Sequence, residues 1–319
     1  MKLRLTTSFA IIIFLCTCKE DETERPTNAE KYLNSLLDIM QEKSVNRYKI
    51  DWPDFRAKVL ATVPGAQSIP ETYPAIKEAL IMLGDNHSFF IKPDGNVIVS
   101  GTLSYDAQTI SSPTLPDNVG YVRIGQFSGS IPSAAATSFA RDIQDQISLQ
   151  DNDNLLGWIV DLRSNLGGNM WPMLAGIGPI LGEGIAGYFI DAYGNELPWS
   201  YLNGSAMLGG NSIFSLENSY ESIVPSPKAA VLLDNGVASS GEVIAISFIG
   251  RDNTKSFGIP TCGASTSNQS FNLSDNSVLF LTSSYLADRE KNIFGIPVTP
   301  DLVSGNDMIV QDALVWIQN

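Results

Sequence analysis

A pair of serines occupies the position in this chain that best suits a nucleophile. Ser239 and Ser240 follow a short apolar stretch at 229–233 and precede a glycine and a second apolar run. This order predicts a buried strand that turns sharply into a helix. A serine at the helix N-terminus gains from the helix dipole, and the amide after it can stabilise an oxyanion. Taken alone, the pair is more typical of a helix N-cap than of a nucleophile.

His87 is the only histidine in the 319 residues. It lies in a polar loop at 85–88, between a predicted helix and a strand-like run at 89–91. A serine nucleophile needs a base of near-neutral pKa, which histidine supplies. If this is a Ser/His enzyme, His87 is its base, although a lone histidine is more often structural.

A third segment combines an apolar strand at 156–161 with a polar turn that ends in Gly167 and Gly168. Two glycines allow close backbone approach and let N–H groups point into a cleft. Such amides can also stabilise an oxyanion, although an ordinary turn is the simpler interpretation of this pattern alone.

The remaining periodicity predicts the elements that position these groups. Helical spacing of apolar residues appears at 29–43, about 51–63 and about 72–83, which indicates an N-terminal helical bundle over 29–90. From 91 to 319, strand-like and helical stretches alternate, which favours an α/β core. A stretch rich in Gly, Asn and Ser at about 185–225 predicts a small β-rich insertion.

Composition excludes several classes of function. Net charge is -14 and no basic run interrupts the part after the leader, so a nucleic-acid partner is not expected. The chain has three cysteines, two of them in the leader, so neither a disulfide framework nor a Cys/His metal site is expected. We expect no metal or organic cofactor.

Residues 1–18 have the pattern of a bacterial lipoprotein signal peptide. A basic start precedes an apolar run too short to span a bilayer, and the segment ends at Cys18. Cleavage before Cys18 and lipidation of it predict an exported protein anchored by lipid to the envelope, in the outer membrane. The anchored protein then faces either the periplasm or the cell exterior. Residues 19–28 are charged and predict a flexible tether.

Four motifs in order resemble those of the C-terminal-processing and tricorn-like serine peptidases, peptidase family S41. They are LGDNHS at 83–88, DLRSNLGG at 161–168, ASSGE at 238–242 and GIPVTPD at 295–301. The resemblance implies a crotonase/ClpP-like α/β core. It also implies that Ser239 is the nucleophile and that Ser240 with Gly167 or Gly168 forms the oxyanion hole.

Two departures from the family pattern point to its nisin-resistance-protein branch. Many members use a Ser/Lys pair with the lysine in a Gly-Lys-x-Thr element, but Ala264 stands at that position. A Ser/His mechanism with His87 therefore fits better. Only about 30 residues separate His87 from the strand at 119, too few for the PDZ domain that many members carry.

The resemblance predicts a peptidase that acts on a peptide or protein substrate through an acyl-enzyme. An acid should orient the imidazole, and Glu242, Asp288 and Glu290 are the candidates. Two alternatives stay open: an inactive peptide-binding surface lipoprotein of the same fold, and an esterase that uses the same Ser/His pair. The sequence does not determine the oligomeric state or the substrate.

Overall fold

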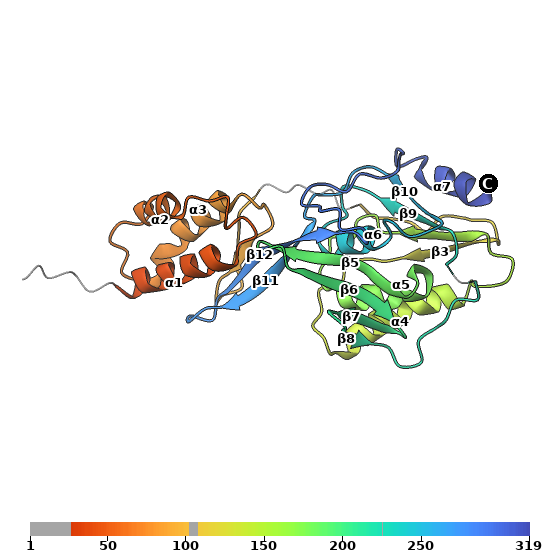
Figure 1. Cartoon of the computed structure of the whole chain (residues 1–319), viewed down its shortest axis with the longest axis horizontal. Helices are drawn as coiled ribbons and strands as arrows, with labels where there is room; N and C mark the ends of the chain where they lie inside the picture. The colour runs from red at the N-terminus through yellow and green to blue at the C-terminus, as the bar shows by residue number, and fades with distance from the viewer. Residues whose placement is uncertain (1–26, 102–107, 225) are drawn as a thin grey trace, which may run out of the picture.

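The structure is a computed structural model that describes residues 27–101, 108–224 and 226–319. The predicted signal peptide, Cys18 and nearly all of the predicted tether lie outside these residues. A helical bundle occupies one end of the molecule and the α/β core the other, with the β11–β12 hairpin between them (Figure 1). None of the helices in the described ranges combines the length and apolarity needed to cross a bilayer.

The bundle consists of α1 (Asn28–Lys43), α2 (Trp52–Ala61) and α3 (Tyr73–Leu83), with a short 3-10 helix, η1, at Ile69–Thr72. These helices lie within a few residues of the predicted ranges. Thr27 begins α1 with a capping box to Glu30, which satisfies backbone N–H groups at the helix start. The apolar faces of the bundle pack on Phe90, Leu279 and Leu281, so two strands close its core.

A parallel five-stranded sheet forms the centre of the α/β core, in the order β13-β10-β9-β4-β3. Its strands are β3 (Val119–Arg123), β4 (Gly157–Asp161), β9 (Ala229–Leu233), β10 (Thr254–Gly258) and β13 (Leu302–Val303). One face packs on α4 (Ala134–Ser148), α5 (Met170–Leu181) and α6 (Ser240–Ser247). The other face packs on α7 (Ile309–Gln318). Burial on both faces explains why β4 and β9 read as continuous apolar runs.

The second sheet is antiparallel and has eight strands, in the order β2-β1-β12-β5-β6-β7-β8 with β11 also paired to β12. Its strands are β1 (Phe89–Ile91), β2 (Val97–Val99), β5 (Gly184–Asp191), β6 (Glu196–Leu202), β7 (Ser205–Leu208), β8 (Asn211–Ser215), β11 (Thr266–Asn272) and β12 (Val278–Ala287). The stretch predicted as a β-rich insertion supplies β5 to β8. Because β5 pairs with β12, this stretch continues the sheet that carries β1.

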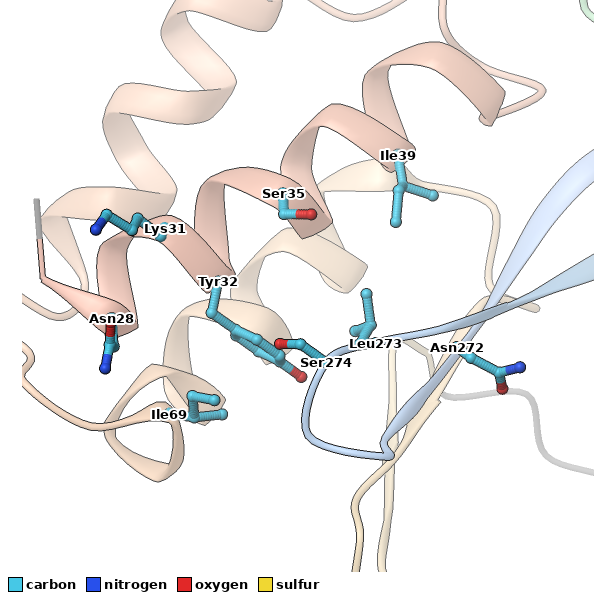
Figure 2. A pocket seen from close by; sticks show the side chains of 9 residues that line it. All are labelled: Asn28, Lys31, Tyr32, Ser35, Ile39, Ile69, Asn272, Leu273 and Ser274. Atoms are coloured by element: carbon cyan, nitrogen blue, oxygen red, sulfur yellow. The ribbon is translucent and has the colours of Figure 1, made fainter.

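Hydrogen bonds hold the bundle on the β11–β12 hairpin. The Tyr32 hydroxyl of α1 lies 2.6 Å from the Ser277 hydroxyl and donates to Asp275 at 3.0 Å. Figure 2 shows Tyr32 pointing toward the hairpin turn, across a pocket that Ser274 also lines. At the other end of α1, the Val45 amide donates to the Thr282 carbonyl at 2.9 Å. These contacts fix α1 and the start of the loop that follows it relative to the β11–β12 hairpin.

Candidate active site

The nucleophile turn connects β9 to α6. Ser239 has φ +52° and ψ -116°, a conformation that a residue with a side chain adopts only when its surroundings enforce it. A sharp, strained strand-to-helix turn of this kind presents a serine hydroxyl at the edge of a sheet. Ser239 lines the largest cleft described in this structure.

The glycine turn after β4 lies directly against the nucleophile turn. The Ala238 amide donates to the Asn165 carbonyl at 3.0 Å, and the Ser240 hydroxyl donates to the Gly168 carbonyl at 2.7 Å. A Cβ added to Gly167 would lie 2.9 Å from the Ser239 Cβ and 2.7 Å from the Ala238 carbonyl oxygen. Only glycine fits so close an approach, and Gly167 also has φ +93°.

The backbone amides of the two turns differ in availability. The Gly167 N–H donates to the Asn165 side-chain oxygen at 3.0 Å, so it is already committed. Among the hydrogen bonds of the described residues, the N–H groups of Gly168 and Ser240 have no acceptor. Both residues line the cleft, whereas Gly167 does not. Of the amides predicted for an oxyanion hole, Gly168 and Ser240 therefore remain available.

The loop that carries His87 is organised by one carboxylate. Asp85 accepts hydrogen bonds from the His87 amide at 3.0 Å and from the Ser88 amide at 2.8 Å and hydroxyl at 2.6 Å. Asn86 has φ +56°, in the left-handed region that glycine and asparagine tolerate best. This geometry explains why asparagine can occupy position 86, where the family motif that LGDNHS resembles usually has glycine.

Thr266 contacts the imidazole directly. Its hydroxyl oxygen lies 2.7 Å from His87 Nδ1, and Asn268 of the same strand donates to the His87 carbonyl at 2.9 Å. Burial lowers the pKa of His87 from 6.5 to about 4, and the nearby Asp85 carboxylate only partly offsets this. The imidazole is therefore neutral at physiological pH, as a general base must be.

The three carboxylates predicted to orient His87 lie elsewhere. Glu242 is fully buried and accepts from the Ser239 amide at 3.0 Å, the Thr261 hydroxyl at 2.5 Å and the Gly263 amide at 2.9 Å. Burial raises the pKa of this carboxyl to about 7. Glu242 therefore holds the nucleophile turn, and among the described residues its carboxylate makes no hydrogen bond to the imidazole.

The late-loop candidates also fail to reach His87. The hydrogen bonds that the Asp288 carboxylate accepts come from the Glu290 amide and from the amide and side chain of Asn292. This carboxylate therefore organises its own turn. The Glu290 side chain is exposed and has no hydrogen bond among those described. The sequence analysis missed Thr266, although a signal was present: it is the threonine of the Gly-Lys-x-Thr element whose lysine is absent here.

Ser239 and His87 line the same cleft, which has a volume of about 1210 Å³. The described contacts include no direct hydrogen bond between them; such bonds often form only when substrate binds. Ala264, at the position of the family lysine, also lines this cleft. No ammonium group can act as base from that position.

The model of peptidase family S41 matches residues 118–304, more than half of the chain. A nisin-resistance protein of Lactococcus lactis subsp. lactis is 30% identical over 312 residues, which are 98% of this chain and 94% of that protein. The chain belongs to peptidase family S41. It is accordingly a serine peptidase by family, and the resemblance seen in the four motifs is confirmed.

Solved structures show that the fold is that of S41 proteases. A lipoprotein from Streptococcus agalactiae matches with a TM-score of 0.72 at 23% identity, over 92% of this chain and 97% of that one. The photosystem II D1 C-terminal processing protease matches with a TM-score of 0.58 at 17% identity, over 88% and 94% respectively. The predicted α/β fold class is confirmed.

Proposed function

We propose that this S41 peptidase hydrolyses peptide bonds through an acyl-enzyme on Ser239, with His87 as general base. The observation that carries the proposal is the shared cleft. It brings together a strained serine turn, two backbone amides with no acceptor and a neutral imidazole, from three segments far apart in the chain. Each group has the chemical property that its role requires.

In the first half of the reaction, His87 Nε2 takes the proton from the Ser239 hydroxyl as the Oγ atom attacks the peptide carbonyl carbon. The carbonyl oxygen becomes an oxyanion that accepts from the Gly168 and Ser240 amides. The imidazolium then protonates the amine as the C–N bond breaks, which leaves the acyl-enzyme. For Nε2 to act as base, Nδ1 carries the hydrogen and donates to the Thr266 hydroxyl oxygen.

In the second half, a water molecule attacks the acyl-enzyme while His87 takes its proton. The tetrahedral intermediate collapses, the Ser239 oxygen leaves and recovers a proton from the imidazolium, and the carboxylic acid product departs. Thr266 keeps the imidazole in one tautomer through both halves. Glu242 acts only indirectly, because it anchors the Ser239 amide.

The proposed setting is the cell envelope. The leader pattern at 1–18 supports export with lipidation at Cys18, and a lipoprotein is among the solved structures of the same fold. One similar protein is a nisin-resistance protein, so nisin is the first substrate to test. The name describes the relative and not this chain. Mass spectrometry of peptides after incubation will distinguish internal cleavage from carboxyl-terminal processing.

The decisive test is intact-mass analysis of the protein lacking residues 1–18 after treatment with a fluorophosphonate. We expect one adduct on the parent protein and none on Ser239→Ala, with labelling of His87→Ala strongly slowed. Circular dichroism of all three proteins checks that they are folded. A folded parent protein without an adduct would refute the acyl-enzyme mechanism and favour an inactive peptide-binding protein.

A further inference from the structure

The described residues that line the cleft around Ser239 carry no charged side chain. The chain has 34 acidic and 20 basic residues, yet no aspartate, glutamate, lysine or arginine is among the described residues that line this cleft. Its polar lining consists of serine, threonine, asparagine and glutamine side chains together with His87. A substrate carboxylate or ammonium group therefore finds no charged partner there.

One wall of the cleft is an apolar sheet face next to the base. Phe89 follows His87 by two residues and stacks on Phe280, with ring centroids 4.5 Å apart and an interplanar angle of 9°. Val99 pairs with Phe89 across β1 and β2, and its side chain is 55% exposed. All three side chains line the cleft.

A second apolar wall begins next to the oxyanion turn, and its strands belong to the same antiparallel sheet as the first. Trp171 follows Gly168 by three residues, at the start of α5. Phe189 and Leu197 pair across β5 and β6, and Leu197 is 44% exposed. These three side chains also line the cleft. One wall thus begins close in sequence to the base, and the other begins close in sequence to the oxyanion turn.

From these two walls we propose that the cleft selects an uncharged peptide segment with apolar side chains on both sides of the scissile bond, within a chain rather than at its end. Exposed apolar side chains in a cleft gain free energy when a ligand covers them. A charged side chain or a terminal carboxylate loses hydration there without compensation. This inference rests on the proposed function for the position of the scissile bond.

Binding to the folded Ser239→Ala protein tests this selectivity without catalysis. The probes are short fluorescent peptides with a central Leu-Phe-Ala-Leu segment and a C-terminal amide, measured by fluorescence anisotropy. A single Leu→Glu or Leu→Lys change in the segment should weaken binding by about tenfold or more, since burying an unpaired charge costs well over 1 kcal/mol. A free C-terminal carboxylate directly after the segment should weaken binding similarly.

Two variants of one edge strand provide a matched comparison. Val97 and Val99 are both on β2, with exposures of 54% and 55%, but only Val99 lines the cleft. Introduced into the Ser239→Ala protein, Val99→Asp should weaken binding of the apolar peptide about tenfold, because the carboxylate loses water under the ligand. Val97→Asp should leave the affinity within about twofold of the Ser239→Ala protein.

Several outcomes would overturn the inference. They are equal affinity for charged and apolar peptides, tighter binding of the free carboxylate, no binding of the apolar peptide at all, and equal effects of the two β2 variants. Labelling of the parent protein by fluorophosphonate is a separate measurement that tests the proposed catalysis. A labelled enzyme that prefers charged peptides contradicts only the selectivity, whereas selective binding without labelling contradicts only the proposed catalysis.

Discussion

The contact between Thr266 and His87 makes a prediction that can be measured on a single residue. Because His87 is the only histidine, its imidazole resonances need no assignment against others in a nuclear magnetic resonance titration. We expect the parent protein to titrate near the pKa of about 4 that burial produces, well below the usual 6.5. The partner at Nδ1 is a hydroxyl at 2.7 Å, so only the nearby Asp85 carboxylate favours the imidazolium, and it offsets burial in part.

Replacement of the hydroxyl by a carboxylate should reverse this behaviour. Thr266→Asp places an anion beside Nδ1, and an opposite charge at such a distance raises a pKa by roughly 1–3 units. Since the base acts only when neutral, the rate of fluorophosphonate labelling should fall at a correspondingly higher pH in this variant. The parent protein should keep its labelling rate down to a pH near 4.

Two further variants separate orientation of the imidazole from charge. Thr266→Val removes the acceptor of the Nδ1 hydrogen, and an unsatisfied buried group costs about 1–3 kcal/mol, which is roughly 5- to 150-fold in labelling rate. Thr266→Ser keeps the hydroxyl and should label at a rate within a few-fold of the parent. A parent His87 that titrates at 6.5 or above, or an aspartate variant with an unchanged titration, would refute this reasoning.

Other residues of the site and core give four more predictions. Glu242→Gln loses an acceptor for the Ser239, Thr261 or Gly263 donors, so labelling should slow by about 10- to 100-fold in a folded protein. Burial raises the pKa of Glu242 from 4.5 to about 7, so the parent should lose stability as pH rises through this range, and chemical denaturation of the glutamine variant should show a smaller loss. Gly167→Ala places a methyl group 2.9 Å from the Ser239 Cβ at φ +93°; we expect a lower melting temperature and little labelling, and normal values for both would contradict the close-packing argument. Leu281→Ala should cost about 2–5 kcal/mol of unfolding free energy in denaturant titration, because the Leu281 side chain of β12 is fully buried in the core of the bundle.

Local patterns were sufficient to predict most secondary structure. Two signals for the helices depend only on near neighbours in the sequence. They are the apolar periodicity over 28–43 and 73–83, and the proline and capping residues at helix starts. The buried parallel strands were recognisable as short apolar runs between turn residues. The segment at 185–225 was correctly read as β-rich, but its membership of the sheet that carries β1 depends on pairing between β5 and β12, nearly 100 residues apart.

The sequence by itself determined the nucleophile turn, the glycine turn and the single histidine, because each depends on residue type and immediate context. It also placed the chain in its family through four motifs in order, which the family model then confirmed. The tertiary structure decided which groups meet. It set Thr266 rather than a carboxylate beside His87, across 179 positions of sequence, and it packed the Gly167 turn against the Ser239 turn through the hydrogen bond between the Ala238 amide and the Asn165 carbonyl. Hydrogen bonds over such separations follow from the packing of whole sheets, which no local pattern encodes.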